Sequence, residues 1–559
     1  MTSTSLPQEI ILLLCQELTA RLDFGTLFRC SLVSRRIASI ALEQIYNIQE
    51  LSPTSTGDAY NKLEWSRLWR SIILSSIGKT AYPYCVYVRS LSLGNLNECL
   101  QDIVRDRHVS DFFFGGPMEQ FLVLHQDRSW TVRTQKLGPS HLINFSGTMT
   151  KCADSITKYI KTSADETGTS VALAHLEGIY IPHDILPNWI TRLRSLTSLR
   201  IRDGSVLGVE AASAVSQYCP SFADLTCYYC SSADEDLAAF FLALRPNTLR
   251  SFEIISQNGI GENALTALNA HATSLRTLLL GSLSPRAMKA LNSLSKCTAL
   301  ETLLIENNKL FNQVDLGYFS EEVLREVIVW ISNCKSLKDL SLVHILNALP
   351  MVKEVLKSPE IRLTSLSVVD FHSGAEEEDD ATWAALGSQV HLESLTLGLL
   401  DGIVNGLMLS QTPVLVDSIC HLENLTSLNL MQSYITDFEV ECFASVLSKL
   451  SEFSFSGDVV NDAVLDILSN LSRLKLLSIN AISVFSFEGL EQFSRKFNTP
   501  DRMGIKVDIL NQLGECKFGE AEYAWLQQYF TDTLKGRIEI TYFMDPDELH
   551  EMDFSDTSD

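Results

Sequence analysis

The chain has 559 residues, 46% of them hydrophobic, and a formal net charge of -24 at pH 7. This acidity argues against binding to nucleic acids or anionic membranes, because both require a basic surface. No apolar run approaches the roughly 18 residues of a membrane span, and no basic segment of a secretory signal opens the chain. We therefore expect a soluble protein of the cytoplasm or nucleus. Its 13 scattered cysteines are typical of reduced thiols in a core.

The first predicted element is a helix within LPQEIILLLCQEL, residues 6–18. Pro7 and Glu9 suit the first turn of a helix, and an unbroken apolar run from Ile10 to Cys15 follows. Two more helices are predicted over roughly 24–30 and 33–45. A unit of about 45 residues cannot bury apolar surface on every side of a helix. We therefore expect another protein to cover part of this surface.

Repeats organise the rest of the chain, after a helical linker expected over residues 49–85. From residue 196 an LxxLxL pattern recurs, and its first apolar position is followed by others at plus three and plus five, as in Leu275, Leu278 and Leu280. Most steps are close to 26 residues, as in leucine-rich repeats. The pattern predicts an α/β horseshoe over 86–544, with parallel strands concave and helices convex. The first positions are Leu196, Phe222, Leu249, Leu275, Leu300, Leu337, Leu363, Leu392, Leu425, Leu450 and Leu474.

Some parts of the repeat region are irregular. Weaker repeat matches lie upstream at Val88, Leu91 and Leu93, and at Leu176, Ile179 and Ile181. Residues 97–170 hold either divergent repeats or a long insertion. The acidic run EEEDD, residues 376–380, is predicted to be a solvated loop. After Leu474 the pattern fades into a C-terminal cap, and the acidic residues 545–559 are expected to be disordered.

Two motifs resemble chemical sites but have structural interpretations. In CYYC, Cys227 falls on the third apolar position of its repeat and Cys230 on the turn that follows. GIGENA, residues 259–264, resembles a dinucleotide fingerprint, but it lies where every repeat turns from strand to helix and lacks the downstream acid. No zinc-protease, nucleophile-elbow or phosphate-loop motif occurs. We therefore expect no catalysis, no metal and no cofactor.

The concave face is the predicted binding surface for a client protein. Interface anchors are enriched in Tyr and Arg, and several such residues fall between the inward positions of the strands. Serine and threonine also abound there, as they would on any exposed strand. The predicted client-binding residues are Arg200, Arg202, Tyr228, Glu253, Ile255 and Glu306.

The first 48 residues resemble the F-box, and the remainder is similar to fungal F-box proteins with leucine-rich repeats. The order is LPxEI, an apolar helix ending at Leu18, a Leu-rich turn, and SLVSRRIASIA. Matching positions are Leu6, Pro7, Glu9, Ile10, Leu14, Leu18, Leu27, Cys30, Val33, Ser34, Arg35, Arg36 and Ala38. The resemblance implies a small Skp-type adaptor as partner, and through it a cullin-RING ubiquitin ligase. The adaptor contacts it implies are Leu6, Pro7, Ile10, Leu14, Leu27 and Val33.

By this resemblance the chain would be the non-catalytic substrate receptor of a ubiquitin ligase. One alternative is an F-box scaffold that binds the adaptor but not the cullin. Another is a leucine-rich GTPase activator, a class that also combines a horseshoe with an acidic tail but leaves the first 48 residues unexplained. The client and its degradation signal cannot be deduced from these residues.

Overall fold

The protein begins with three helices. The computed structural model describes residues 6–21, 23–47, 49, 62–125, 143–231, 233–309, 320–371, 376–399 and 407–542. Helices α1 (Gln8–Ala20), α2 (Phe24–Ser31) and α3 (Arg35–Asn47) lie close to the predicted ranges. Asp23 caps α2, because its side chain accepts a hydrogen bond from the backbone N–H of Thr26 at 2.9 Å.

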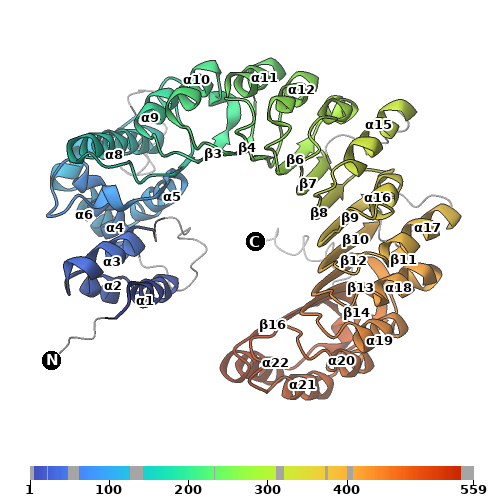
Figure 1. Ribbon diagram of the computed structural model, residues 1–559. Coiled ribbons are helices and arrows are strands. Elements are labelled where there is room, and N and C mark those ends of the chain that lie inside the picture. The colour runs from blue at the N-terminus through green and yellow to red at the C-terminus, as the bar shows by residue number, and fades with distance from the viewer. Residues whose placement is uncertain are drawn as a thin grey trace, which may run out of the picture. The chain divides into compact units, whose positions relative to one another are not determined.

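The chain forms two compact units, Met1–Leu275 and Arg276–Asp559. In each unit the strands lie on one side and the helices on the other, as Figure 1 shows. We call these two sides the strand face and the helix face. All strand pairs described within each unit's sheet are parallel. The predicted fold, an α/β leucine-rich-repeat solenoid preceded by three helices, is confirmed.

In the first unit the sheet runs in the order β1-β2-β3-β4-β5. The strands are β1 (Ser90–Ser92), β2 (His175–Gly178), β3 (Ser198–Asp203), β4 (Asp224–Tyr229) and β5 (Ser251–Ile254). Helices α9 (Leu186–Arg192), α10 (Val209–Tyr218), α11 (Asp234–Ala243) and α12 (Glu262–Leu268) return the chain, with short 3₁₀ turns η6 (Gly204–Val206) and η7 (Asn269–His271).

A large helical insertion separates the first two strands. Because β1 pairs directly with β2, the described residues between them form the connection of a single enlarged repeat. Within residues 97–170 this favours an insertion over divergent repeats. The helical segments before and within it are α4 (Lys62–Ser75), η3 (Tyr84–Tyr87), α5 (Leu93–Ile103), α6 (Arg107–Phe114), η4 (Gly116–Phe121) and α8 (Phe145–Thr167).

The second unit carries the longer sheet, in the order β6-β7-β8-β9-β10-β12-β13-β14-β15-β16, with β11 paired to β12 alone. Its strands are β6 (Thr277–Leu283), β7 (Thr302–Asn307), β8 (Asp339–Val343), β9 (Ser365–Phe371), β10 (Ser394–Leu399), β11 (Leu407–Met408), β12 (Ser427–Ile435), β13 (Glu452–Val460), β14 (Leu476–Ser483), β15 (Lys506–Gln512) and β16 (Arg537–Tyr542).

Helices alternate with these strands and close the unit. They are α13 (Pro285–Lys289), η8 (Leu291–Leu294), α15 (Glu321–Ser332), α16 (Ala348–Leu356), α17 (Glu376–Leu386), η9 (Leu409–Gln411), α18 (Pro413–Cys420), α19 (Asp437–Val446), α20 (Asp462–Leu468), α21 (Phe487–Lys496), η10 (Gly514–Cys516), α22 (Glu520–Gln528) and the π-helix η11 (Tyr529–Thr533). The predicted tail 545–559 lies outside the described residues.

The repeat register follows the sequence pattern. Each of the eleven predicted first positions is at least 97% buried, and the apolar residues at plus three form continuous ladders, such as Leu199, Leu225 and Phe252 on β3, β4 and β5. Stacking identical positions in adjacent repeats buries one continuous core. This stacking is what makes the leucine spacing a reliable predictor of the fold.

One predicted repeat was placed in the wrong register. Leu176 pairs with Leu199, which is a plus-three position, so the first position of this repeat is Leu173 rather than Leu176. Gly178 then occupies the plus-five position. A Cβ atom there would lie 2.0 Å from Cδ1 of Ile181, so Ile181 fills the space that an apolar side chain occupies in other repeats.

The acidic run 376–380 was wrongly predicted to be a loop, because it forms the first turns of α17. Negative side chains stabilise this end of a helix through the helix dipole and its free N–H groups. The motif GIGENA also has a structural role. The carboxylate of Asp234 accepts hydrogen bonds from the backbone N–H groups of Gly261, Asn263 and Ala264 at 2.7 to 2.9 Å. These donors of α12 are therefore already bound by the preceding repeat.

Candidate interaction surfaces

Helix α1 exposes most of its apolar residues. Only Ile11 and Cys15 are buried along its length, whereas Ile10, Leu13 and Leu14 are 42%, 60% and 54% exposed. Positions three and four apart share one face of a helix. These three side chains therefore form an apolar stripe that faces away from the three-helix core.

More apolar side chains are exposed before α1, within it, and on α2 and the turn that follows α2. Eight of the 23 exposed large apolar side chains of the described chain fall within residues 6–33. We call this set the N-terminal apolar surface; it consists of Leu6, Ile10, Leu12, Leu13, Leu14, Phe28, Leu32 and Val33. Such clustering makes this surface a candidate site for a partner.

The other side of the three-helix unit is covered by the same chain. The ring of Phe24 lies edge-on to Trp65 of α4, with centroids 6.2 Å apart, and Tyr46 stacks on Tyr84 at 5.1 Å. The Tyr46 hydroxyl also lies 3.1 Å from that of Ser71. Helices α2 and α3 are thus attached to α4 and η3, and the exposed stripe of α1 is left uncovered by any described residue.

Five of the six predicted adaptor contacts lie on the surface. Leu6, Pro7, Ile10, Leu14 and Val33 are exposed. The prediction for Leu27 is corrected, since this side chain is fully buried and stabilises the unit from inside. Sequence alone did not separate it from the others, because an apolar residue on a short helix fits either role.

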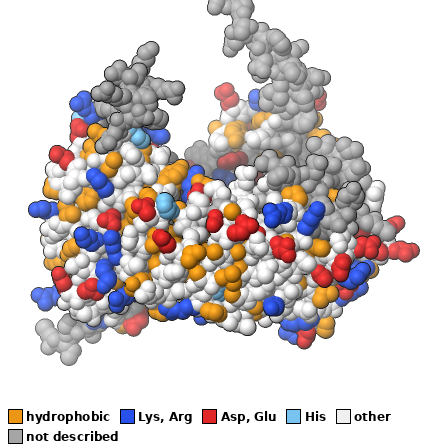
Figure 2. All heavy atoms as spheres, turned by 90° about the horizontal axis from the view of Figure 1, so that it is seen from above, with side chains coloured by type: hydrophobic (Ala, Val, Ile, Leu, Met, Phe, Trp, Pro, Cys, Tyr) orange, Lys and Arg blue, Asp and Glu red, His pale blue; other side chains and the backbone are white. Residues whose placement is uncertain are grey.

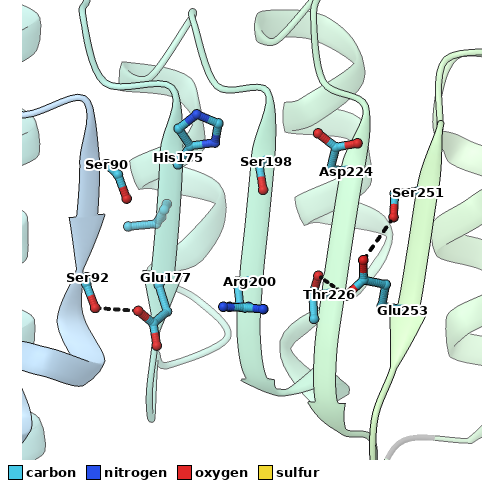
Figure 3. A pocket seen from close by; sticks show the side chains of 11 residues that line it. Ser90, Ser92, His175, Glu177, Ser198, Arg200, Asp224, Thr226, Ser251 and Glu253 are labelled. Carbon is cyan, nitrogen blue, oxygen red and sulfur yellow. Dashed lines mark hydrogen bonds between the residues drawn. The ribbon is translucent and has the colours of Figure 1, made fainter. Parts of the chain in front are cut away.

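The strand face of the first unit carries a second candidate surface, shown in Figure 3. Strands β1 to β5 place polar side chains side by side around a depression of about 470 Å³. Register gives two rows across the strands. The first row is Ser90, His175, Ser198, Asp224 and Ser251, and the second is Ser92, Glu177, Arg200, Thr226 and Glu253.

Hydroxyl groups hold the carboxylates of this depression in place. The Ser92 hydroxyl donates a hydrogen bond to Glu177. The hydroxyls of Thr226 and Ser251 both donate to Glu253, at 3.3 Å. Partial burial raises the pKa of Asp224, and the nearby His175 opposes that shift. The carboxylates are thereby oriented but not neutralised, because hydroxyl donors carry no charge.

Two arginines extend from β3 beside exposed aromatic rings. The Arg200 guanidinium lies 5.7 Å from the ring centre of Tyr228, and that of Arg202 lies 5.7 Å from the ring of Tyr180. Tyr180, Tyr228 and Ile255 are 55%, 37% and 46% exposed. Arg and Tyr are enriched at interface hot spots, and Ile255 adds exposed apolar area on the same face.

Five of the six predicted client-binding residues therefore lie together on the strand face of the first unit. Glu306 belongs to the second unit, where its Oε1 lies 4.0 Å from Nε2 of the buried His344. The sequence analysis missed His175 and Glu177, because it took Leu176 as the first position of its repeat. Counting from Leu173 places both residues on the strand face.

Three further observations concern metal binding, cysteine reactivity and membrane-spanning helices. Among the described residues, no group of three His, Cys, Asp or Glu side chains has the geometry of a metal site. Burial raises the pKa of the Cys227 thiol, which is the opposite of what a reactive cysteine needs. The described helices include none that is both long and apolar enough to cross a bilayer.

Comparison with known proteins gives only distant structural similarity. No family model and no curated protein sequence matches this chain. Similar solved structures include an internalin (inlF) of Listeria monocytogenes, with 15% identity over 71% of this chain and 98% of that one, at a TM-score of 0.35. A chain of the yeast Rad7 and Elc1 complex aligns with 11% identity over 71% and 97%, at 0.34. A chain of the TLR13-ssRNA13 complex aligns with 13% identity over 82% and 67%, at 0.28.

By its own strand order and buried repeat register, the chain is an α/β leucine-rich-repeat protein with a helical N-terminal unit. Its function has to be argued from its own surfaces, because similarity at these TM-scores carries no information on partners.

Proposed function

We propose that this protein is the substrate receptor of a Skp-cullin-F-box ubiquitin ligase. The N-terminal helices bind a small Skp-type adaptor, and the repeats hold a client protein for ubiquitination in the cytoplasm or nucleus. The observation that carries the proposal is the N-terminal apolar surface, which no described part of the chain covers. It coincides with the part of the sequence that resembles an F-box.

The energetics of such a surface support binding to a preformed protein partner. Burying apolar area contributes roughly 25 cal/mol per Å², and a few well-packed residues near the centre of an interface carry most of its affinity. The receptor itself performs no reaction in this proposal. Its contribution is proximity, since it holds a client lysine near the charged ubiquitin-conjugating enzyme.

The test is binding of the purified full chain to a Skp-type adaptor. The double variant Ile10→Glu with Leu14→Glu should lose at least about thirtyfold in affinity, which corresponds to about 2 kcal/mol at a hot spot. Both side chains are exposed, so the fold should persist. Val209→Glu is the matched control, because Val209 is an equally exposed aliphatic residue on α10 of the same unit.

An adaptor affinity that is unchanged in the double variant would contradict the proposal. Purification of the wild-type complex adds a second result. Recovery of the cullin with the adaptor supports the ligase receptor, whereas adaptor without cullin would assign the scaffold role instead.

A further inference from the structure

The strand face of the first unit presents two arginines without acidic partners. Among the described residues, no carboxylate forms an ion pair with Arg200 or Arg202, whose contacts are with the rings of Tyr228 and Tyr180. Elsewhere in this unit, Arg192 pairs with Asp154 and Arg89 with Glu43, each at 2.7 Å. Acidic side chains outnumber basic ones, 68 to 44, yet these two neighbouring guanidinium groups on one strand carry no ion pair and can bind an anionic side chain of a partner.

Stacking prepares these arginines for that partner. A guanidinium group over an aromatic ring keeps its five N–H donors free at the edge, where they match the two oxygens of a carboxylate. Arg200 and Arg202 are two positions apart on β3, so both extend from the same face. Both guanidinium groups can therefore donate parallel hydrogen bonds to a negatively charged side chain.

The surrounding charges limit how negative the partner can be. Glu177 on β2 lies directly beside Arg200 in the register, and Asp224 and Glu253 line the same depression. Neighbouring strands are roughly 4.8 Å apart, so a bound anion would feel these carboxylates at short range. A doubly charged phosphate would double both its attraction to the arginines and its repulsion from these carboxylates, whereas the cost of removing it from water rises more steeply than its charge. The site therefore favours Asp or Glu over a phosphorylated residue.

Apolar side chains beside the arginines define the rest of the recognised segment. Tyr180 and Ile255 follow the C-terminal ends of β2 and β5, Tyr228 lies near the C-terminal end of β4, and all three side chains are exposed. They can bury an aliphatic or aromatic side chain next to the acidic one.

We propose that the strand face of β2 to β5 binds an extended peptide segment of the client in which an Asp or Glu side chain lies next to a large apolar residue. Arg200 and Arg202 bind the carboxylate, and Tyr180, Tyr228 and Ile255 cover the apolar neighbour. This inference rests on the proposed receptor function and specifies the chemistry of its client.

The experiment is a selection of random peptides, displayed on phage, against the purified full chain. Peptides enriched in Asp or Glu beside Leu, Ile, Phe, Tyr or Trp are expected. The consensus peptide is then synthesised, and its affinity is measured by fluorescence polarisation. Arg200→Ala with Arg202→Ala should weaken binding by at least about tenfold. Arg105→Ala with Arg107→Ala is the control, because these exposed arginines lie between α5 and α6 and at the start of α6, outside the depression.

Variants of the peptide test the charge argument. Replacing the acidic residue by Gln or Lys should abolish binding, and replacing it by phosphoserine should weaken it. The protein variant Glu177→Gln with Glu253→Gln should reduce the penalty for phosphoserine, because it removes two of the repelling charges. Tighter binding of phosphoserine than of Glu by the wild-type protein would overturn the proposal.

Adaptor binding, measured on the same preparations, distinguishes failure of the acidic-segment proposal from failure of the proposed receptor function. Enrichment of basic or purely apolar peptides, or an arginine variant that binds the consensus peptide normally, overturns the acidic-segment proposal even if the adaptor still binds. A chain that binds the acidic peptide but no adaptor retains the peptide site and loses the ligase assignment.

Discussion

At the scale of single residues, buried polar side chains connect successive repeats. Nδ1 of His271 accepts a hydrogen bond from the backbone N–H of Leu249 at 3.4 Å, and Nε2 lies 3.2 Å from the carbonyl oxygen of Phe241. Only the neutral imidazole with its proton on Nε2 satisfies both contacts. Gln389 has the same role in a later repeat, where its side-chain oxygen accepts from the N–H of Leu363 at 3.0 Å.

This arrangement predicts that acid weakens the first unit through His271. Burial lowers the pKa of His271 below its ordinary value of 6.5, although the Phe241 carbonyl opposes the shift. The unfolded chain therefore binds the proton more readily than the folded one, so stability is complete above pH 6.5 and falls as the pH drops from there toward the folded pKa. One such group contributes a slope of at most about 1.4 kcal/mol per pH unit.

His271→Gln should reduce this slope, because a glutamine can satisfy both contacts without titrating in this range. Urea unfolding measured over a series of pH values, with hydrogen exchange to isolate the first unit, provides the test. His108→Gln, which replaces an exposed imidazole in the same unit, is the control. An identical slope for wild type and His271→Gln would refute the assignment.

At the scale of elements, the first strand of the sheet is protected by one side chain. Gln49 is fully buried, and its amide donates to the carbonyl of Ser90 and accepts from the N–H of Ser92 at 3.0 Å. It thus takes the place of a neighbouring strand along β1. Its own carbonyl oxygen accepts from the Asn95 amide at 2.9 Å. Unpaired edge strands are prone to pair with other chains, so this cap keeps the sheet from continuing there.

Gln49→Ala should open this edge. Loss of a buried hydrogen-bonding partner costs about 1 to 3 kcal/mol, so amide exchange in β1 should accelerate by about tenfold to hundredfold. Hydrogen exchange measured by mass spectrometry on a peptide covering β1 reports this directly. Gln101→Ala, on the exposed side of α5, should leave the exchange of β1 as in the wild type. Unchanged protection in Gln49→Ala would show that the cap is dispensable.

At the scale of the whole molecule, each repeat contacts chiefly its sequence neighbours within its unit. Stability in such a solenoid is approximately a sum of repeat and nearest-neighbour contributions. A defect should therefore spread over a few repeats and no further. Figure 2 shows acidic and basic side chains interspersed over one face of the protein.

Leu342→Ala tests this local coupling in the second unit. Leu342 is fully buried on β8 and stacks on Ile305 of β7 and Val368 of β9. Its truncation should cost about 2 to 5 kcal/mol and accelerate exchange in β7, β8 and β9, while β1 to β5 stay protected. Ser341→Ala, on the strand face of the same strand, should cost less than about 0.5 kcal/mol. Uniformly faster exchange in both units would contradict the repeat model.

The repeats and the exposed stripe of α1 could be predicted from sequence, because both are local patterns. A leucine every 25 or so residues implies stacked repeats, and an apolar run without a polar face cannot be covered by a unit of three helices. The predictions that failed depended on contacts between distant segments. In the sequence Leu27 cannot be distinguished from the exposed apolar residues around it, and only the packing of the three helices buries it. The acidic run 376–380 forms the start of a helix because of its place in the repeat.

Sequence spacing by itself determined the α/β repeat architecture, since inward leucines must recur once per strand. Tertiary structure alone decided that the described residues between β1 and β2 form one enlarged connection, because only the pairing of β1 with β2 shows it. The same pairing places Glu177 beside Arg200, although 22 residues separate them in the chain. The physical reason is that hydrogen bonding between strands decides which residues of adjacent strands lie side by side. A local sequence pattern does not specify which charged side chains become neighbours in this way.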